Sequence, residues 1–182
     1  MIGLQRGVVA LNEHNSEWAK LAEQTIDMLW SVIGDDAADI QHVGSTSIPG
    51  IVAKPIIDIA IGMRDIRQIE CYRDPLAAHQ VYYRGQDVPD QLLFVMGDFE
   101  KDTRTHHIHV VQWKGRRWND YVNFRDYLTC FESKAREYEA LKRDLAQTHA
   151  CDRAAYTAGK SDMIARFLRE AESWKEESKW QK

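Results

Sequence analysis

The fold is decided by two neighbouring stretches, His-Val-Gly-Ser-Thr-Ser-Ile-Pro-Gly at residues 42–50 and Lys-Pro-Ile-Ile-Asp-Ile-Ala-Ile-Gly at residues 54–62. They predict a short strand ending at Val43, a tight loop of small residues, and a second strand that begins just after Pro55. The second strand is apolar apart from Asp58. An unpaired carboxylate in an apolar setting is unfavourable, so Asp58 needs a functional explanation.

The two faces of the second strand are expected to differ. Because side chains alternate along a strand, Ile57, Ile59 and Ile61 suit a hydrophobic core. The opposite face holds Asp58 among small residues, and we expect it to leave room for a ligand.

The loop before this strand has the composition of a phosphate-binding turn. Gly44 and Ser45 have little side chain, so their backbone N–H groups can approach a phosphate closely. Ser45, Thr46 or Ser47 adds a hydroxyl. The loop and Asp58 together predict a phosphate cradle that faces a metal-binding carboxylate.

A second stretch with candidate functional side chains is His-His-Ile-His at residues 106–109. On a strand, His107 and His109 share one face and His106 lies on the other. Imidazoles bind metals, donate to phosphates or act as acids and bases near neutral pH; a structural role is the alternative. We expect Asp58, His107 and His109 to converge on one ion, and such a ligand set favours a transition metal over magnesium.

Two cations outside these motifs are candidates for contact with phosphate. Lys54 lies directly before Pro55, and a solvated loop lysine is the alternative interpretation. Arg125 could bind a phosphate through both guanidinium N–H groups, or pair with Asp126 or another nearby acid.

These features together resemble a known family. A Gly-Ser pair followed, after a short spacer, by Asp58 on a strand resembles the signature of the polymerase-beta-like nucleotidyltransferase fold. More narrowly, residues 42–50 and 54–59 look like the GrpB family of nucleotidyltransferase-like proteins, which also occur fused to dephospho-CoA kinase. Further segments agree with that family in order: Trp18, His107–Val110, Phe124–Leu128, Tyr138 with Leu141 and Lys142, and Tyr156 with Lys160.

The resemblance implies a nucleoside triphosphate such as ATP, Mg²⁺ or Mn²⁺, and transfer of a nucleotidyl group to a small acceptor. Asp58 and His109 would be catalytic, and Lys142 and Lys160 would join the other cations in offsetting phosphate charge. Enzymes of this fold carry a second acid two residues after the first, where this chain has Ala60. The alternatives are therefore a nucleotide- or metabolite-binding module without catalysis, and a histidine-based metal hydrolase.

The expected architecture is α+β (α/β), a mixed sheet packed against helices, in one domain over residues 1–182. Residues 1–118 would contain the sheet and residues 119–182 would be helical. Apolar spacing predicts an edge strand at Val8–Leu11, a helix after Asn15 or Ser16 that ends at Gly34, and a helix over residues 65–79. It also predicts a β-hairpin of residues 92–99 with 106–113, a helix that begins at Asn119 or Asp120, and further helices at about 133–148, 152–158 and from 161.

Composition narrows the function classes. The chain has 24 basic and 28 acidic residues and a net charge of −4, so it has no general attraction for a polyanion and bulk nucleic acid is not expected as a partner. Its three cysteines are widely separated and predict neither a disulfide framework nor a zinc knuckle. With no apolar run long enough to span a bilayer, we expect a soluble cytoplasmic protein.

Overall fold

A five-stranded mixed sheet is the centre of the fold in the computed structural model, which describes residues 2–180. The strand order is β2-β3-β7-β5-β4. Strands β3 and β7 run parallel, and the other neighbours are antiparallel. The strands span these residues: β2 Ala37–Val43, β3 Ile57–Met63, β4 Tyr82–Val88, β5 Gln91–Met96 and β7 His106–Gln112. The predicted pair of strands around the Gly-Ser loop is confirmed.

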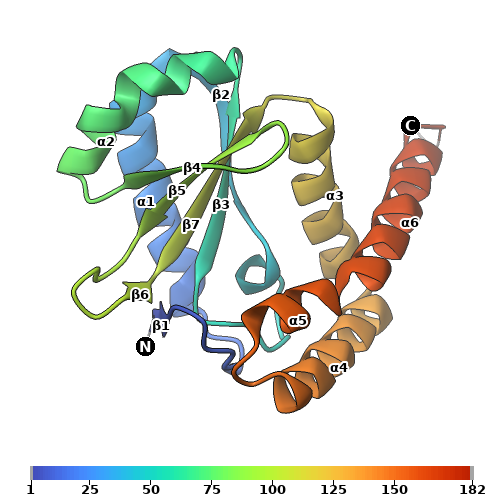
Figure 1. Cartoon of the computed structure of the whole chain (residues 1–182). Helices are drawn as coiled ribbons and strands as arrows, with labels where there is room; N and C mark the ends of the chain where they lie inside the picture. The colour runs from blue at the N-terminus through green and yellow to red at the C-terminus, as the bar shows by residue number, and fades with distance from the viewer. Residues whose placement is uncertain (1, 181–182) are drawn as a thin grey trace.

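Helices cover both faces of the sheet (Figure 1). The helices α1 (Glu17–Ile33) and α2 (Arg73–Ala78) lie on one side, and α3 (Arg116–Cys130) lies on the other. A second group of helices, α4 (Glu132–Thr148), α5 (Arg153–Ala158) and α6 (Ser161–Trp180), stands beside the loop that joins β2 to β3. The α+β architecture predicted from the sequence is therefore confirmed.

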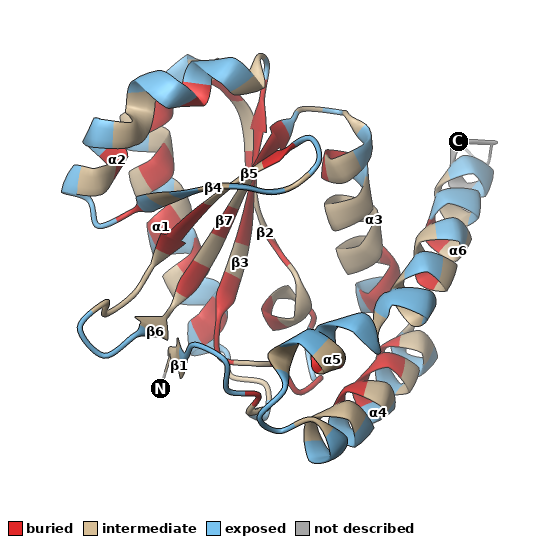
Figure 2. Ribbon diagram, in the orientation of Figure 1, coloured by how far each residue is buried: buried red, intermediate tan, exposed pale blue. Residues whose placement is uncertain are grey.

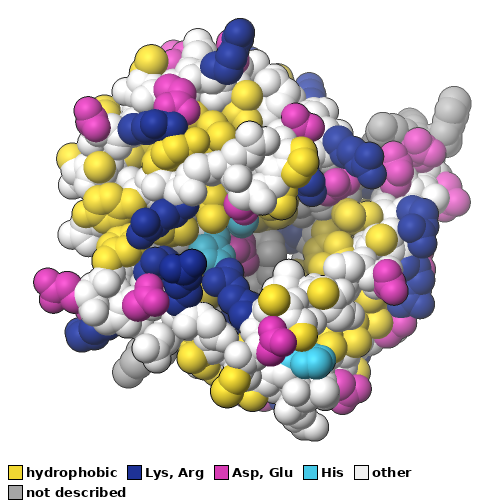
Figure 3. All heavy atoms as spheres, viewed as in Figure 1, with side chains coloured by type: hydrophobic (Ala, Val, Ile, Leu, Met, Phe, Trp, Pro, Cys, Tyr) yellow, Lys and Arg dark blue, Asp and Glu magenta, His cyan; other side chains and the backbone are white. Residues whose placement is uncertain are grey.

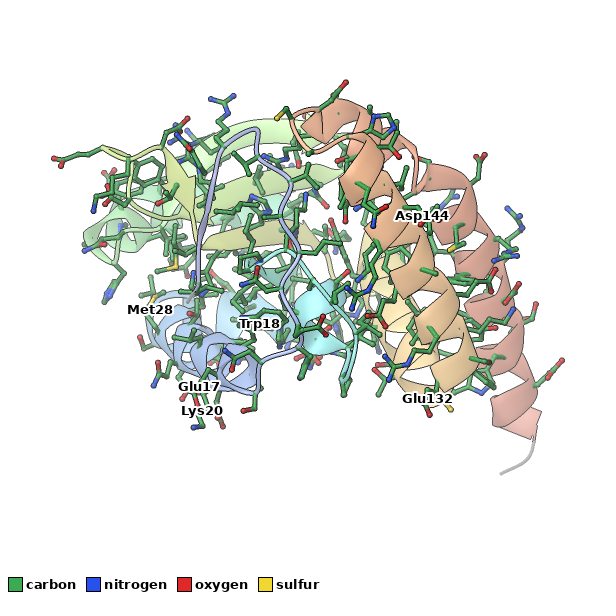
Figure 4. All side chains as sticks on the ribbon, turned by 90° about the horizontal axis from the view of Figure 1, so that it is seen from below. Glu17, Trp18, Lys20, Met28, Glu132 and Asp144 are labelled. Atoms are coloured by element: carbon green, nitrogen blue, oxygen red, sulfur yellow. The ribbon has the colours of Figure 1, made fainter. Side chains whose placement is uncertain are left out.

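The main core lies between α1 and the sheet. Trp18 and Leu29 of α1 are buried against Ile57, Ile59 and Ile61 of β3, so the predicted apolar face of this strand is correct. Figure 2 shows the buried residues along the strands and the inner side of the helix. In Figure 4, Glu17 and Lys20 lie on the outer side of α1, where they form an exposed ion pair.

A second core joins the helical group to the loop between β2 and β3. Ile48 and Ile51 of this loop pack with Tyr127 of α3, Tyr138 of α4 and Phe167 of α6. The long loop is thus held between the sheet and the helices, and its apolar residues explain why it lies in a fixed place beside Asp58.

Two predicted elements are wrong in position. The N-terminal strand is β1 (Leu4–Gln5), which pairs with β6 (Thr103–Arg104), whereas residues 8–11 form no strand. Helix α3 begins at Arg116 rather than at Asn119 or Asp120, with Gly115 as its N-cap. The suggested division between residues 118 and 119 therefore falls inside a helix. No helix within residues 2–180 is long and apolar enough to cross a membrane.

Candidate functional site

Asp58 meets two histidines from the neighbouring strand. The parallel pairing of β3 with β7 places Asp58 opposite His107, and residue 60 opposite His109. His107 Nδ1 and His109 Nε2 each lie 3.4 Å from Oδ1 of Asp58. The carboxylate side chain keeps 29% of its surface exposed, so a ligand can reach it. The structure brings together the three side chains that the sequence placed in one site.

The imidazoles stabilise the charged form of this carboxylate. Burial acts to raise the pKa of the Asp58 carboxyl, but hydrogen bonds and charge interactions with His107 and His109 outweigh it and hold the pKa far below the ordinary value. Asp58 is therefore ionised at any pH at which the protein would work. A carboxylate in this state can accept hydrogen bonds or bind a cation.

The residues fit an oxygen-preferring ion such as Mg²⁺ or Mn²⁺ better than a metal that needs several imidazole ligands. No group of three or more His, Cys, Asp or Glu side chains within residues 2–180 is arranged to hold a metal ion, so Asp58, His107 and His109 are not preassembled as the predicted transition-metal site, which stays a prediction. Mg²⁺ commonly uses one or two carboxylates and completes its coordination with water and substrate phosphates. Asp58 fits that pattern for Mg²⁺ or Mn²⁺, with the histidines as partners of the carboxylate.

The Gly-Ser loop lies directly against Asp58. Gly44 has φ +71°, and a Cβ atom added there would lie 2.5 Å from Oδ2 of Asp58. Ser45 begins a short 3₁₀ turn over residues 45–47, and its side chain is hydrogen-bonded to Tyr138. The backbone can approach the carboxylate this closely only because residue 44 has no side chain.

Thr46 has a mainly structural place in this loop. It is buried, and its hydroxyl is hydrogen-bonded to His42 Nε2 at 3.0 Å. Burial lowers the pKa of His42 to about 4, so this imidazole is neutral at pH 7. The predicted contact of Thr46 with a ligand remains a prediction, but its hydroxyl already has a partner.

The cavity around Asp58 has two lobes. One lobe, of about 340 Å³, is lined by four cations and is called the cationic lobe here: Lys54, Lys142, Arg153 and Lys160. The other, of about 270 Å³, is lined by three aromatic rings and is called the aromatic lobe: Tyr121, Phe124 and Tyr138. The two lobes meet at Gly44, Ser45, Asp58, Tyr121 and Lys160, which line both. Figure 3 shows this hollow, with histidines inside it and Lys and Arg side chains along its edge.

The cationic lobe is short of negative charge. Lys54 and Lys160 each place Nζ 4.7 Å from the centre of the Tyr156 ring, and Lys142 donates to the carbonyl of Val52. Among the described residues, none of the lobe's four cations forms an ion pair. Apart from Asp58, no acid within residues 2–180 lines the lobe, and such a group of cations favours an anion with several charges.

Burial and mutual repulsion make these lysines unusual. Burial, together with the nearby charge of Lys160, lowers the pKa of Lys142 to about 7 and that of Lys54 to about 8. The pKa of Lys160 is itself lowered by burial. A bound polyanion would reverse these shifts, because it favours the charged form of each lysine.

Arg125 was expected to bind phosphate, but its guanidinium group is held by other partners. Its guanidinium group donates to Asp126 Oδ1 at 2.7 and 2.9 Å, to Gln41 Oε1 at 2.8 Å and to the carbonyl of His42 at 3.0 Å. It lines neither lobe. Arg125 instead ties α3 to the end of β2, and the alternative pairing with Asp126 is the one observed.

The expectation of an open face along the whole of β3 is also wrong. Ala60 is fully buried with Val43, Val111 and Trp118. A Cβ atom on Gly62 would lie 2.9 Å from the rings of Trp113 and Trp118. Ala60 and Gly62 therefore pack against the first turn of α3. On this face of β3, only Asp58 lies at the cavity.

Several residues of the site carried no assigned role in the sequence. Tyr121 stacks on His109, with ring centres 5.0 Å apart, and donates to Gln91 Oε1 at 2.7 Å. Arg153 gave no signal beyond its position after Asp152, which caps α5. Tyr156 belonged to the family pattern, but only the structure shows its ring between two lysines of one lobe.

Comparison with known proteins identifies the family. The family model described as GrpB protein matches residues 8–170. The glutamate-rich protein GrpB of Alkalihalophilus pseudofirmus is 36% identical over 173 residues, which cover 93% of this chain and 99% of that protein. The UPF0157 protein YqkA of Bacillus subtilis is 32% identical over 163 residues, 89% of this chain and 47% of that protein.

A solved structure agrees with these sequence matches. The crystal structure of the conserved protein GrpB from Enterococcus faecalis superposes with a TM-score of 0.82 and 26% identity, covering 91% of this chain and 99% of that one. Sequence and fold thus point the same way over most of the chain. The chain belongs to the GrpB family.

Proposed function

We propose that this protein binds a nucleoside triphosphate with Mg²⁺ or Mn²⁺ and transfers its nucleotidyl group to a small acceptor. The observation that carries the proposal is the cationic lobe, in which four cations without counter-ions lie beside the ionised Asp58 and the Gly-Ser loop. A triphosphate carries about four negative charges at neutral pH, which the cationic side chains and a divalent ion at Asp58 would offset together.

Each part of the site has a task in this proposal. The backbone N–H groups of Gly44 and Ser45 contact a phosphate, and Lys54, Lys142, Arg153 and Lys160 neutralise the triphosphate and the pyrophosphate that leaves. Asp58 would hold the divalent ion, which when bound polarises phosphate oxygens and offsets their charge.

The transfer itself exchanges one P–O bond for another. The acceptor oxygen forms a bond to the α-phosphorus, the bond to the bridging oxygen breaks, and pyrophosphate leaves with that electron pair. His109 lies at Asp58 and is held in place by its stack on Tyr121. Because Nε2 faces Asp58 and Nδ1 is buried, we assign the proton that the acceptor hydroxyl loses to the pair of Asp58 and His109 rather than to the imidazole alone.

A binding module without catalysis is the competing proposal, and Ala60 favours it. The standard two-metal mechanism needs a second acid near the first, and the position two residues after Asp58 is buried under α3. In this version the same cavity binds the nucleotide and Mg²⁺ but releases both unchanged.

Calorimetric titration with ATP and GTP in the presence of MgCl₂ or MnCl₂, followed by product analysis with α-labelled nucleotide and candidate acceptors, separates the two. Binding with release of pyrophosphate supports the transferase, and binding without turnover supports the module. Asp58→Asn should abolish metal-dependent binding, whereas Asp27→Asn, an exposed carboxylate on α1, should leave it unchanged. Unchanged affinity in Asp58→Asn would remove this carboxylate from the site.

A further inference from the structure

We propose that the aromatic lobe binds the base of the nucleotide and that Asp120 at its far end selects guanine. This inference rests on the proposed function, because it assigns the second half of the ligand whose triphosphate occupies the cationic lobe. It goes further in naming the base and the residue that recognises it.

The position of the lobe determines which part of a nucleotide can occupy it. The two lobes share the Gly-Ser loop, Asp58, Tyr121 and Lys160, so the α-phosphate lies at their junction when the β- and γ-phosphates lie among the other cations. The group on the other side of the α-phosphate is the nucleoside. A nucleoside therefore extends from the junction into the aromatic lobe.

The walls of this lobe suit a planar ring. Phe124 and Tyr138 meet edge to face with their ring centres 5.3 Å apart, and Ile164 and Leu168 of α6 complete the apolar lining. Tyr121 forms the side next to Asp58. Aromatic and aliphatic walls of this kind favour a base through stacking and apolar burial.

The far end of the lobe is polar. Arg117 and Asp120 line the aromatic lobe and also a second groove, which runs past the start of α3 to Asp90 and Gln112 and does not reach Asp58. They therefore lie at the end away from the phosphates. Within residues 2–180 neither side chain forms an ion pair, and neither has a side-chain hydrogen bond.

Asp120 is a half-buried carboxylate in need of donors. Burial raises its pKa, while the charges of Arg116 and Arg117 lower it. An ionised carboxylate has two oxygens that only accept hydrogen bonds. The ligand group that best satisfies it is one that offers two adjacent N–H donors.

Guanine is the base with that pattern. Its Watson–Crick edge presents N1–H and the 2-amino group side by side, with the O6 acceptor next to them. A carboxylate can accept from both donors while Arg117 donates to O6, whereas adenine, cytosine and uracil each lack two adjacent ring and amino donors. A site built on such contacts discriminates strongly against an analogue that lacks a donor.

The test is calorimetric titration of the whole protein with Mg²⁺ and four probes: GTP, ITP, ATP and tripolyphosphate. ITP is GTP without the 2-amino group, and tripolyphosphate has no base. We expect GTP to bind at least about tenfold more tightly than each of the other three. Phe124→Leu should weaken GTP binding by at least about tenfold and leave the affinity for tripolyphosphate within about twofold.

Asp120→Asn should reduce the preference for GTP over ITP to less than about threefold. The matched control is Glu172→Gln, which removes a negative charge that acts on Asp120 but does not line the aromatic lobe. It should keep the full preference.

The outcomes separate this inference from the proposed function. If tripolyphosphate binds as tightly as GTP, the base site is wrong and the triphosphate site stands. Equal preference for GTP over ITP in Asp120→Asn and in wild type would overturn the role of Asp120. If neither GTP nor tripolyphosphate binds, the proposed function fails, and the base site fails with it.

Discussion

The Oδ2 atom of Asp58 occupies the space that a side chain on Gly44 would need, since an added Cβ atom would lie only 2.5 Å away. Gly44 also has φ +71° and ψ −172°, a conformation that is nearly confined to glycine. Gly44→Ala should therefore lower the free energy of unfolding by about 1–3 kcal/mol and also push the carboxylate away from the loop. We expect loss of nucleotide binding, measured by titration at a temperature where the variant is folded.

Gly34 provides the matched control for this substitution. It has nearly the same backbone conformation, φ +59° and ψ −142°, but nothing lies within 4 Å of an added Cβ atom. Gly34→Ala should lose similar stability and keep wild-type affinity. If both variants bind nucleotide normally, the contact between Gly44 and Asp58 has no part in the site.

The local sequence pattern was sufficient to predict the two strands, β3 and β7, that carry Asp58 and the histidines of the site. Alternation along β3 assigned Asp58 and the isoleucines to the correct faces, and the spacing of His107 and His109 placed both imidazoles at one carboxylate. These predictions succeeded because strand periodicity fixes direction from sequence alone.

The residues that the helices contribute to the site could not be predicted from the local sequence pattern. Arg125 and Arg153 are both arginines in or beside helices, and only tertiary contacts decide that the first pairs with Asp126 while the second faces the cavity. The start of α3 depends on Trp118 fitting over Gly62, a contact between residues far apart in the chain. Local propensity contains no information about such contacts.

Lys142 should make the free energy of unfolding rise with pH, an effect that an exposed lysine does not produce. Its side chain is 1% exposed, and burial lowers its pKa to about 7. Between that value and the unfolded pKa near 10.4, the unfolded chain binds more protons, so stability rises with pH. Relative to Lys142→Met, wild type should gain about 2–4 kcal/mol in the free energy of unfolding from pH 7 to pH 10.

Urea unfolding at several pH values measures this difference. Lys20 is an exposed lysine on α1, and the difference between wild type and Lys20→Met should stay nearly constant over the same range. A constant difference for Lys142→Met as well would show that this amine is already solvated and charged in the folded protein.

Binding of a triphosphate should be accompanied by proton uptake. The partly neutral Lys142, with its pKa of about 7, and the Lys54 amine, with its pKa of about 8, both become fully charged when an anion enters the cationic lobe. Titrations at pH 8 in buffers of different ionisation enthalpy should show uptake of roughly 1.4 protons, about 0.9 at Lys142 and about 0.5 at Lys54. Binding without proton exchange would mean that the phosphates do not approach these two amines.

Substitutions of Arg125 and Lys160 should have different effects: the first should lower stability and the second should lower nucleotide affinity. Arg125→Met removes the hydrogen bonds to Asp126, Gln41 and the carbonyl of His42, and we expect a loss of about 2–3 kcal/mol in the free energy of unfolding with nucleotide affinity within about twofold of wild type. Lys160→Met removes a cation of the lobe that forms no ion pair among the described residues.

The Lys160→Met variant should show the opposite pattern, a loss of affinity of at least about tenfold with little change in unfolding. Urea unfolding and calorimetric titration of both variants provide the comparison. A large loss of affinity in Arg125→Met at unchanged stability would return Arg125 to the list of phosphate-binding residues.

Replacing Ala60 by an acid should not restore a two-metal site. Ala60 is fully buried against Val43, Val111 and Trp118, so Ala60→Asp would place a second carboxylate near Asp58 without water or a cation. We expect a loss of about 3–5 kcal/mol in the free energy of unfolding and no gain in metal-dependent turnover. Ala60→Asn has nearly the same shape without the charge and should lose clearly less. A stable Ala60→Asp protein that gains turnover with Mg²⁺ would show that α3 can move away from this position, and that one substitution is all that separates the site from two-metal chemistry.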